Sequence, residues 1–388
     1  MRWIPSLALC AAVSAGCTLF GDRPCEPGRY SCPGSEPGPA DDLGGSRACS
    51  LEAPCALGPL LDSSPADGAP ELVALSGRGD EAWLVGSAGG QGVLLHAQRG
   101  QPSRQVATLP VATPRALTLI EGEPPTLLIA SQGSALYKYA PETGLLPPVS
   151  LDTGGCQGRL SATGALSGAL ALGPEDFWLV GAPTSDAAAG LFRVRAGVCQ
   201  VLPELASAGL AFHGVWGALR DLREPAQRLV WTVGDSGAAV MWSFQGPDGP
   251  PLVQRFALPG LAPLRAVSGS VHCPAQPPAG SADAGLCAFM ITGSALYGAT
   301  DGAPQPVPLP AVLQPAELLG LFVDGDSVWL VGSLSAAGLV ARYQPSLAAW
   351  SYRAGLRGGA LRAAWGPGDG SLWIAGDQGT VLYLPKGP

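Results

Sequence analysis

The stretch LRAAWGPGDGSLWIAGDQGTVLYL, residues 361–384, decides the fold. Its short runs of apolar, β-branched and aromatic residues are separated by Gly, Asp and Pro, which predicts three short β-strands joined by two tight turns. A closely similar pattern recurs until the chain contains seven such units. One unit cannot bury its apolar faces alone, so the repetition predicts units that pack against one another.

The most recognisable part of each unit is a strand of the form aromatic-apolar-apolar-Gly, followed by a Gly-containing turn and a second apolar strand. The seven examples are residues 82–97, 126–139, 177–194, 230–244, 287–299, 328–343 and 372–384. The residues that we place at equivalent positions are Trp83, Leu127, Trp178, Trp231, Ala288, Trp329 and Trp373. Their spacing of about 41 to 57 residues is typical of a β-propeller, in which each repeat forms one blade.

Each unit also has a preceding strand, such as ELVALSG at residues 71–77, and a fourth run, such as RQVATLP at residues 104–110. We therefore expect an all-β chain that forms a single seven-bladed β-propeller of four-stranded antiparallel blades. The last unit reaches Pro388 after only three strands, and an unpaired outer edge would favour aggregation. A strand near residues 55–63 is therefore predicted to pair with residues 380–384 and to close the ring.

Composition agrees with this prediction and excludes one class of partner. Only 13% of residues are charged, and the chain contains 55 Gly and 39 Pro, which favours short strands and turns over long helices. The net charge is −8, and the basic residues are spread thinly along the chain. A nucleic-acid partner requires a basic stripe, so none is predicted.

Residues 1–16 have the pattern of a signal peptide, with Arg2, a short apolar stretch and a run of small residues. The sequence Ser14-Ala15-Gly16-Cys17 resembles the lipobox of bacterial lipoproteins, although Ser14 stands where that family usually has Leu. The resemblance implies that Cys17 carries lipid and, because Thr18 and not Asp follows, that the protein lies at the outer membrane of a Gram-negative bacterium. The protein would then be attached to the membrane by its lipid anchor only. The alternative is ordinary secretion with Cys17 as a normal thiol.

We divide the remaining chain into a tether rich in Cys, Pro and Gly at residues 17–55 and a propeller at residues 56–388. Besides Cys10 and Cys17, eight cysteines remain, and an oxidising periplasm permits four disulfides. Within the tether, the candidates for disulfide bonds are Cys25, Cys32, Cys49 and Cys55, and their pairing is left open. In the propeller, we expect Cys156 to pair with Cys199 and Cys273 to pair with Cys287. No metal site or cofactor is predicted, because C-x-x-C pairs are absent and the three histidines lack ligand spacing.

The combination of V/A-W-G, then W-x-x-G-x-x-G, then an apolar strand that ends near Tyr resembles the repeats of bacterial cell-surface propeller proteins. The blade is also similar to WD-repeat, kelch and sialidase-like blades. The resemblance covers about residues 57–388 and implies a fold but no particular activity, because propellers serve both as enzymes and as binding platforms.

Three groups of residues suggest chemistry and are each better explained by structure. Residues 234–237, Gly-Asp-Ser-Gly, resemble the nucleophile motif of chymotrypsin-like proteases, but the matching residues 376–379 lack the serine, which favours a hairpin turn. The tryptophans could stack on a glycan, yet their repetition, which includes a second shared position at Trp216 and Trp365, favours packing between blades. The acidic residues could hold calcium or form a carboxylate pair, but most flank the same hairpin, as solvated turns do: Asp80, Glu81, Glu175, Asp176, Asp324 and Asp326.

No catalytic residue is predicted. We expect a monomeric, non-enzymatic, envelope-anchored binding or scaffold protein with a protein or glycan partner. The insertion at residues 272–287, with His272, is either a functional loop or a tolerated insertion. The alternative function is an enzyme that acts on glycans or small molecules at the central channel. An enzyme requires convergent polar residues with shifted pKa values, whereas a platform requires an exposed apolar or aromatic patch on a rim.

Overall fold

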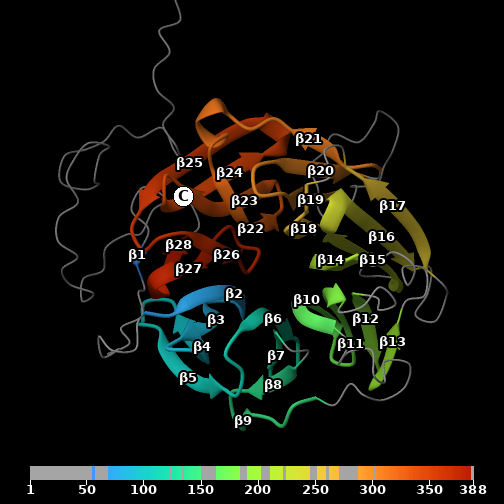
Figure 1. Cartoon of the computed structure of the whole chain (residues 1–388), viewed down its shortest axis with the longest axis vertical. Helices are drawn as coiled ribbons and strands as arrows, with labels where there is room; N and C mark the ends of the chain where they lie inside the picture. Colours follow the sequence, from blue (N-terminus) through green and yellow to red (C-terminus); the bar gives the residue numbers. More distant parts are fainter. Residues whose placement is uncertain are drawn as a thin grey trace, which may run out of the picture.

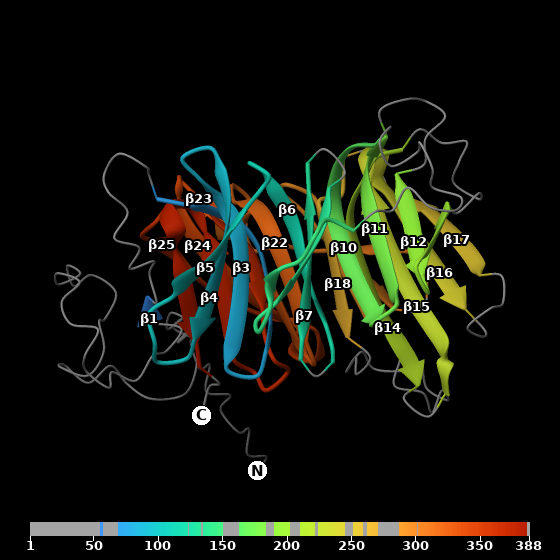
Figure 2. The ribbon, with the colours of Figure 1, turned by 90° about the horizontal axis from the view of Figure 1, so that it is seen from below.

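The computed structural model is an all-β, seven-bladed propeller, as the repeat predicts (Figure 1). Its strands form seven four-stranded antiparallel sheets, and they run between the two faces of the ring (Figure 2). In the part of the chain that the structure describes, no helix is long and apolar enough to cross a membrane. The described residues are 55–56, 69–122, 124–132, 135–149, 163–183, 190–201, 210–221, 224–244, 251–258, 262–270, 287–300 and 302–385.

Each blade has its first strand nearest the axis of the ring, and the strands follow outward in chain order except in the last blade. Blades 1 and 2 contain β2 (Glu71–Arg78), β3 (Glu81–Ala88), β4 (Gln91–Gln98), β5 (Arg104–Leu109), β6 (Pro114–Ile120), β7 (Thr126–Ser131), β8 (Leu136–Ala140) and β9 (Gly144–Leu145). Blades 3 and 4 contain β10 (Thr163–Gly173), β11 (Asp176–Pro183), β12 (Leu191–Arg195), β13 (Val198–Val201), β14 (Phe212–Asp221), β15 (Glu224–Gly234), β16 (Ala238–Phe244) and β17 (Leu252–Ala257). Blades 5 and 6 contain β18 (Ala266–Ser270), β19 (Cys287–Ile291), β20 (Leu296–Thr300), β21 (Gln305–Val307), β22 (Glu317–Asp324), β23 (Ser327–Leu334), β24 (Ala337–Gln344) and β25 (Ala349–Leu356).

The last blade joins the two ends of the chain. It contains β26 (Leu361–Trp365), β27 (Leu372–Gly376) and β28 (Val381–Leu384), and its outermost strand is β1 (Cys55–Ala56). Cys55 lies opposite Tyr383, and Ala56 lies opposite Leu382. The predicted closure by a strand from the N-terminal side is therefore confirmed.

The second strand of each blade is buried on both faces and packs alternately against the two neighbouring blades. Trp83 and Val85 belong to the apolar core between blades 1 and 2, whereas Ala82 and Leu84 belong to the core between blades 7 and 1. The recurring tryptophans of the second strand, Trp83, Trp178, Trp231, Trp329 and Trp373, are at most 5% exposed. Their predicted role in packing between blades is confirmed.

Two of the seven equivalent positions were predicted wrongly, each by one residue. Leu127 and Ala288 pack against the preceding blade, whereas every equivalent tryptophan packs against the following blade. Leu128 and Phe289 take the tryptophan's place in blades 2 and 5. Because side chains alternate along a strand, a shift of one residue moves a side chain to the other face, and these two blades have no tryptophan to mark the register.

The innermost strands meet through side chains of complementary size. A Cβ at Gly77 would lie 2.6 Å from the indole of Trp365, and one at Gly269 would lie 2.7 Å from that of Trp216. The pairs Leu170 with Gly217 and Phe322 with Gly366 follow the same rule, at 2.9 and 3.0 Å. At two other junctions the glycine is replaced by Leu119 or Val323, and the facing residue is a serine, Ser76 or Ser268, whose Oγ accepts a hydrogen bond from the larger residue's N–H at 3.1 Å.

Candidate functional site

The innermost strands bulge near the face at which they begin, and we name this face the axial face. A bulge adds one unpaired residue to a strand and re-aims its side chain. Six of the seven innermost strands have a register shift there, and Arg265 takes the corresponding place in blade 5. The bulge residues of the other blades are Val73, Arg115, Ser167, His213, Leu319 and Arg362.

Ion pairs on the axial face link neighbouring blades. Arg362 of blade 7 lies 3.0 Å from Glu71 of blade 1 and also pairs with Asp377 of its own blade. Arg265 of blade 5 lies 2.9 Å from Glu317 of blade 6, and both side chains are about half exposed, at 43% and 54%. Exposed pairs of this kind contribute about 0–1 kcal/mol each, so they add little to stability and leave charge at the surface.

The Gly-Asp-Ser-Gly motif is a turn, as predicted from its counterpart in the last blade. Ser236 has φ 55° within a single 3-10 turn, and Gln378 has φ 53° in the equivalent turn of blade 7. Nε2 of His213 lies 2.7 Å from Oδ1 of Asp235, just as Arg362 pairs with the aspartate of the other turn. The aspartate therefore anchors the bulge residue of its own blade in both cases.

The prediction that the acidic residues are solvated turns is wrong for Asp176. This residue is only 6% exposed and accepts hydrogen bonds from Nε and Nη2 of Arg193, at 3.0 and 2.8 Å. Arg228, from blade 4, also donates to it. Asp176 lies two residues before Trp178 on a strand that faces the next blade, so its carboxylate enters the junction between blades and not solvent. Among the described residues, no group of three His, Cys, Asp or Glu could hold a metal ion.

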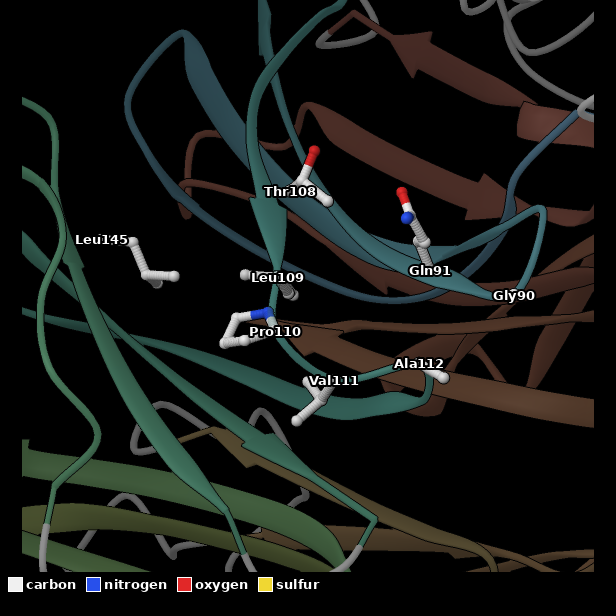
Figure 3. Close-up of a pocket in the computed structure, with 8 residues that line it drawn as sticks. All are labelled: Gly90, Gln91, Thr108, Leu109, Pro110, Val111, Ala112 and Leu145. Carbon is white, nitrogen blue, oxygen red and sulfur yellow. The ribbon is translucent and has the colours of Figure 1, made fainter.

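A hollow with a volume of about 500 Å³ lies between blades 1 and 2 at the axial side, and we name it the axial hollow (Figure 3). Leu145 of blade 2 lies across from Leu109, Pro110 and Val111 of blade 1. Gln91 and Thr108 supply the polar groups of its lining. The hollow is thus an apolar surface with a small polar border.

A second pocket between the same two blades has a volume of about 350 Å³, and we name it the flank pocket. Glu81, Trp83, His96, Arg104 and Tyr139 line it, together with prolines of blade 2. Nε2 of His96 lies 3.7 Å from Glu81, beyond hydrogen-bond distance, and has no hydrogen-bond partner among the described atoms. Burial lowers the pKa of His96 from its ordinary value of 6.5, the charge of Glu81 partly raises it, and the charge of Arg104 lowers it.

Sequence reasoning missed this pocket. Its signal is the residue that lies directly across from the recurring tryptophan on the third strand of the blade. That residue is His96 opposite Trp83, and it is an arginine opposite Trp178 and Trp329. Reading the sequence across the hairpin, and not only along it, would have found the position.

The cysteine predictions are only partly within the described residues. Cys199 and Cys287 are each 1% exposed, and each is disulfide-bonded. Their predicted partners, Cys156 and Cys273, lie outside the described residues, so both pairings stay predictions. The same holds for Cys17, Cys25, Cys32, Cys49 and His272, and for the role of the insertion around residues 272–286.

The comparisons with known proteins identify a fold and no family. No family model and no curated protein matches the sequence. The structure is similar to the WD40 β-propeller domain of Doa1, with a TM-score of 0.55, 10% identity, and coverage of 82% of this chain and 94% of that one. It is also similar to the β-propeller domain of Myceliophteria thermophila Cps50 (Swd1), with a TM-score of 0.55, 11% identity, and coverage of 81% and 97%. The structure is similar to YCF48 from Cyanidioschyzon merolae as well, with a TM-score of 0.53, 13% identity, and coverage of 82% of this chain and 96% of that one. At such identities the likeness shows the propeller fold alone.

Proposed function

We propose that this chain is a monomeric, non-enzymatic binding protein that is exported, held at the outer membrane of a Gram-negative cell by lipid on Cys17, and bound to a protein partner through its axial face. One observation carries the binding role. The axial hollow opens between the outermost strands β5 and β9, and the exposed charged pairs of the bulge residues lie at the innermost strands of the axial face. A partner that covers this face would meet an apolar patch at the rim and charged groups nearer the axis, and protein interfaces combine both kinds of contact.

The charges of the axial face favour binding over catalysis. General acid and base chemistry requires carboxylates or other titratable groups that act on one reacting atom. The carboxylates of Glu71 and Asp377 instead converge on the guanidinium group of Arg362. An enzyme that acts on glycans or small molecules at the centre of the ring is therefore the less favoured alternative.

The binding role is tested by affinity purification from detergent-solubilised envelopes. We expect the native chain to co-purify a partner that the Val111→Asp variant loses, because the new carboxylate would be desolvated against the apolar hollow. Leu252→Asp is the matched control, since Leu252 is 62% exposed on β17 in blade 4 and should keep the partner. Equal recovery with both variants would contradict the proposed face, and recovery of a glycan would redefine the partner.

The anchor is tested separately by mass spectrometry of the mature N-terminus. We expect a diacylglyceryl group on Cys17, and we expect Cys17→Ser to move the protein to the soluble fraction. An unmodified Cys17 would contradict the lipid anchor and favour ordinary secretion.

A further inference from the structure

The propeller repeats one site in which a cation lies against the tryptophan of a blade. In blade 3, Arg193 lies directly across from Trp178, and its guanidinium carbon is 5.7 Å from the centre of the Trp178 ring. Phe244 of the next blade lies 4.9 Å from the same carbon and meets Trp178 edge to face, and Asp176 accepts two hydrogen bonds from the guanidinium group. The cation thus contacts two aromatic rings and a carboxylate.

Blade 6 repeats the arrangement. Arg342 lies across from Trp329, and its guanidinium carbon is 5.4 Å from the ring centre. Two of its nitrogens donate to Oγ of Ser327, which stands two residues before the tryptophan as Asp176 does in blade 3. The site therefore receives an arginine from its own blade at both places.

Blade 1 has the same site without the arginine. Trp83 is retained, Glu81 stands in the place of Asp176, and His96 stands in the place of Arg193. The shorter imidazole lies 5.1 Å from the Trp83 ring and makes no hydrogen bond to Glu81. The volume that a guanidinium group fills in blade 3 corresponds to the flank pocket, which is open in blade 1.

Blade 2, which faces this site, also does not supply the side chains that blade 4 supplies to the site of blade 3. Arg228 and Phe244 of blade 4, which complete the site of blade 3, correspond to Pro125 and Pro141 of blade 2, which line the flank pocket. The carboxylate of Asp176 meets two guanidinium groups, whereas the ion pair that the described residues give Glu81 is the 3.7 Å contact with His96, and the side chain of Glu81 is 42% exposed. The flank pocket therefore offers an accessible carboxylate next to Trp83, which is 4% exposed and whose ring lies 5.1 Å from the imidazole of His96.

We propose that the flank pocket binds the guanidinium group of an arginine side chain of a protein partner, in the position that Arg193 occupies within blade 3. The inference rests on the proposed function only in taking the partner to be a protein. When the imidazole of His96 turns away from the ring of Trp83, a planar guanidinium group can stack on that ring while it donates hydrogen bonds to Glu81, a combination that a compact ammonium group makes less well. Arg104 lines the same pocket and opposes the incoming cation.

The test uses the whole chain with 15N-labelled tryptophan and a short probe, acetyl-Gly-Arg-Gly-amide, with the citrulline peptide as its uncharged counterpart. The indole signal of Trp83 is assigned with Trp83→Phe. We expect a saturable shift with the arginine peptide and binding of the citrulline peptide that is weaker by about tenfold or more. Glu81→Gln should weaken the arginine peptide by a similar factor, and Arg104→Gln should strengthen it.

Two further variants make the result specific. His96→Arg supplies the cation from within blade 1, as in blades 3 and 6, and should abolish binding of the probe while raising the melting temperature. Asp80→Asn is the control, because Asp80 is adjacent to Glu81 but is 61% exposed and pairs with Arg99 outside the pocket. It should leave the affinity unchanged.

An equal response to the arginine and citrulline peptides would overturn the proposal, as would a His96→Arg variant that binds the probe as well as the native chain does. If Glu81→Gln fails to fold, the comparison of His96→Arg with the native chain still decides. The probe reports on the flank pocket alone. Its failure would therefore leave the proposed function to be judged by the Val111→Asp purification.

Discussion

The indole ring of Trp365, in the last blade, lies against the backbone of Gly77 in the first blade, so that a Cβ at Gly77 would be 2.6 Å from Cζ3 of Trp365. The contact lies at the junction where the two ends of the propeller meet. Close packing leaves no room for one more methyl group at this point.

We expect Gly77→Ala to lower the free energy of unfolding by about 2 kcal/mol, because the new methyl group would press on the Trp365 ring and on the carbonyl oxygen of Glu81. Urea denaturation measures the change. Gly173→Ala is the control, since nothing lies within 4 Å of a Cβ there. The two variants should differ clearly, and equal effects would contradict the steric explanation.

Removal of a buried serine hydroxyl should also destabilise the ring. Ser268 is 7% exposed, and its Oγ accepts a hydrogen bond from the N–H of Val323. Ser268→Ala leaves that N–H buried without a partner, which costs about 1–3 kcal/mol. The exposed Ser294→Ala, measured by the same denaturation experiment, should change stability by less than about 0.5 kcal/mol.

The buried carboxylate between blades 3 and 4 should be among the most sensitive positions. Asp176→Ala leaves the guanidinium groups of Arg193 and Arg228 without their counter-ion, and the side chain of Arg193 is only 7% exposed. We expect a loss of about 3–5 kcal/mol in the free energy of unfolding. Asp80→Ala, at an exposed pair, should cost less than about 1 kcal/mol. A small effect at Asp176 would mean that the cluster is solvated.

Removal of the closing strand should expose an edge. A chain that begins at residue 57 lacks β1, so the outer side of β28 loses its pairing at Leu382 and Tyr383. We expect a lower melting temperature and concentration-dependent association on a size-exclusion column, because unpaired strand edges pair with other chains. A truncated chain that stays monomeric and equally stable would show that the pairing contributes little.

Acidification should destabilise the protein partly through His96. The pKa of His96 is lowered in the folded chain, so the folded state binds its proton less readily than the unfolded state does. The stabilising contribution is therefore complete above the ordinary pKa of 6.5 and is lost as the pH falls below that value toward the lowered one. The charged or titratable groups that face the imidazole from both blades are Glu81, Arg104, Tyr139 and Glu142.

The measurement compares the urea midpoints of the native chain and of His96→Phe at pH 7.5 and at pH 5.5. The native chain should lose more stability between these values than the variant does. The two proteins differ only at residue 96, so the difference between them isolates His96. An identical loss of stability in both proteins would show that His96 does not contribute to the pH dependence.

Most of the fold could be predicted because its determinants are local. The glycine that ends each W-x-x-G run is required because a Cβ there would meet a backbone carbonyl group near the start of the innermost strand, as Gly86 would meet that of Glu71. This contact recurs with the blade and is visible in the sequence. In blades 2 and 5 the tryptophan is absent, and the register was accordingly misjudged by one residue at Leu127 and Ala288.

The flank pocket and the buried cluster could not be predicted because their determinants are distant. Asp176 acquires its second cation from Arg228, which belongs to the next blade. The flank pocket exists because blade 2 has Pro125 and Pro141 at the positions from which blade 4 places Arg228 and Phe244 in the site of blade 3. Both outcomes depend on which residues face each other between blades, and the period of the repeat carries no information about that.

The pairs of complementary size between innermost strands also restrict which blades the ring could lose. Trp216 and Trp365 each face a glycine in the following blade, whereas Leu119 and Val323 each face a serine in the preceding one. Deletion of blade 1 would set Trp365 against Leu119, and deletion of blade 5 would set Trp216 against Val323. Loss of either of these two blades would therefore need a compensating substitution in an adjacent blade, so blades 1 and 5 hold the seven-bladed count in place.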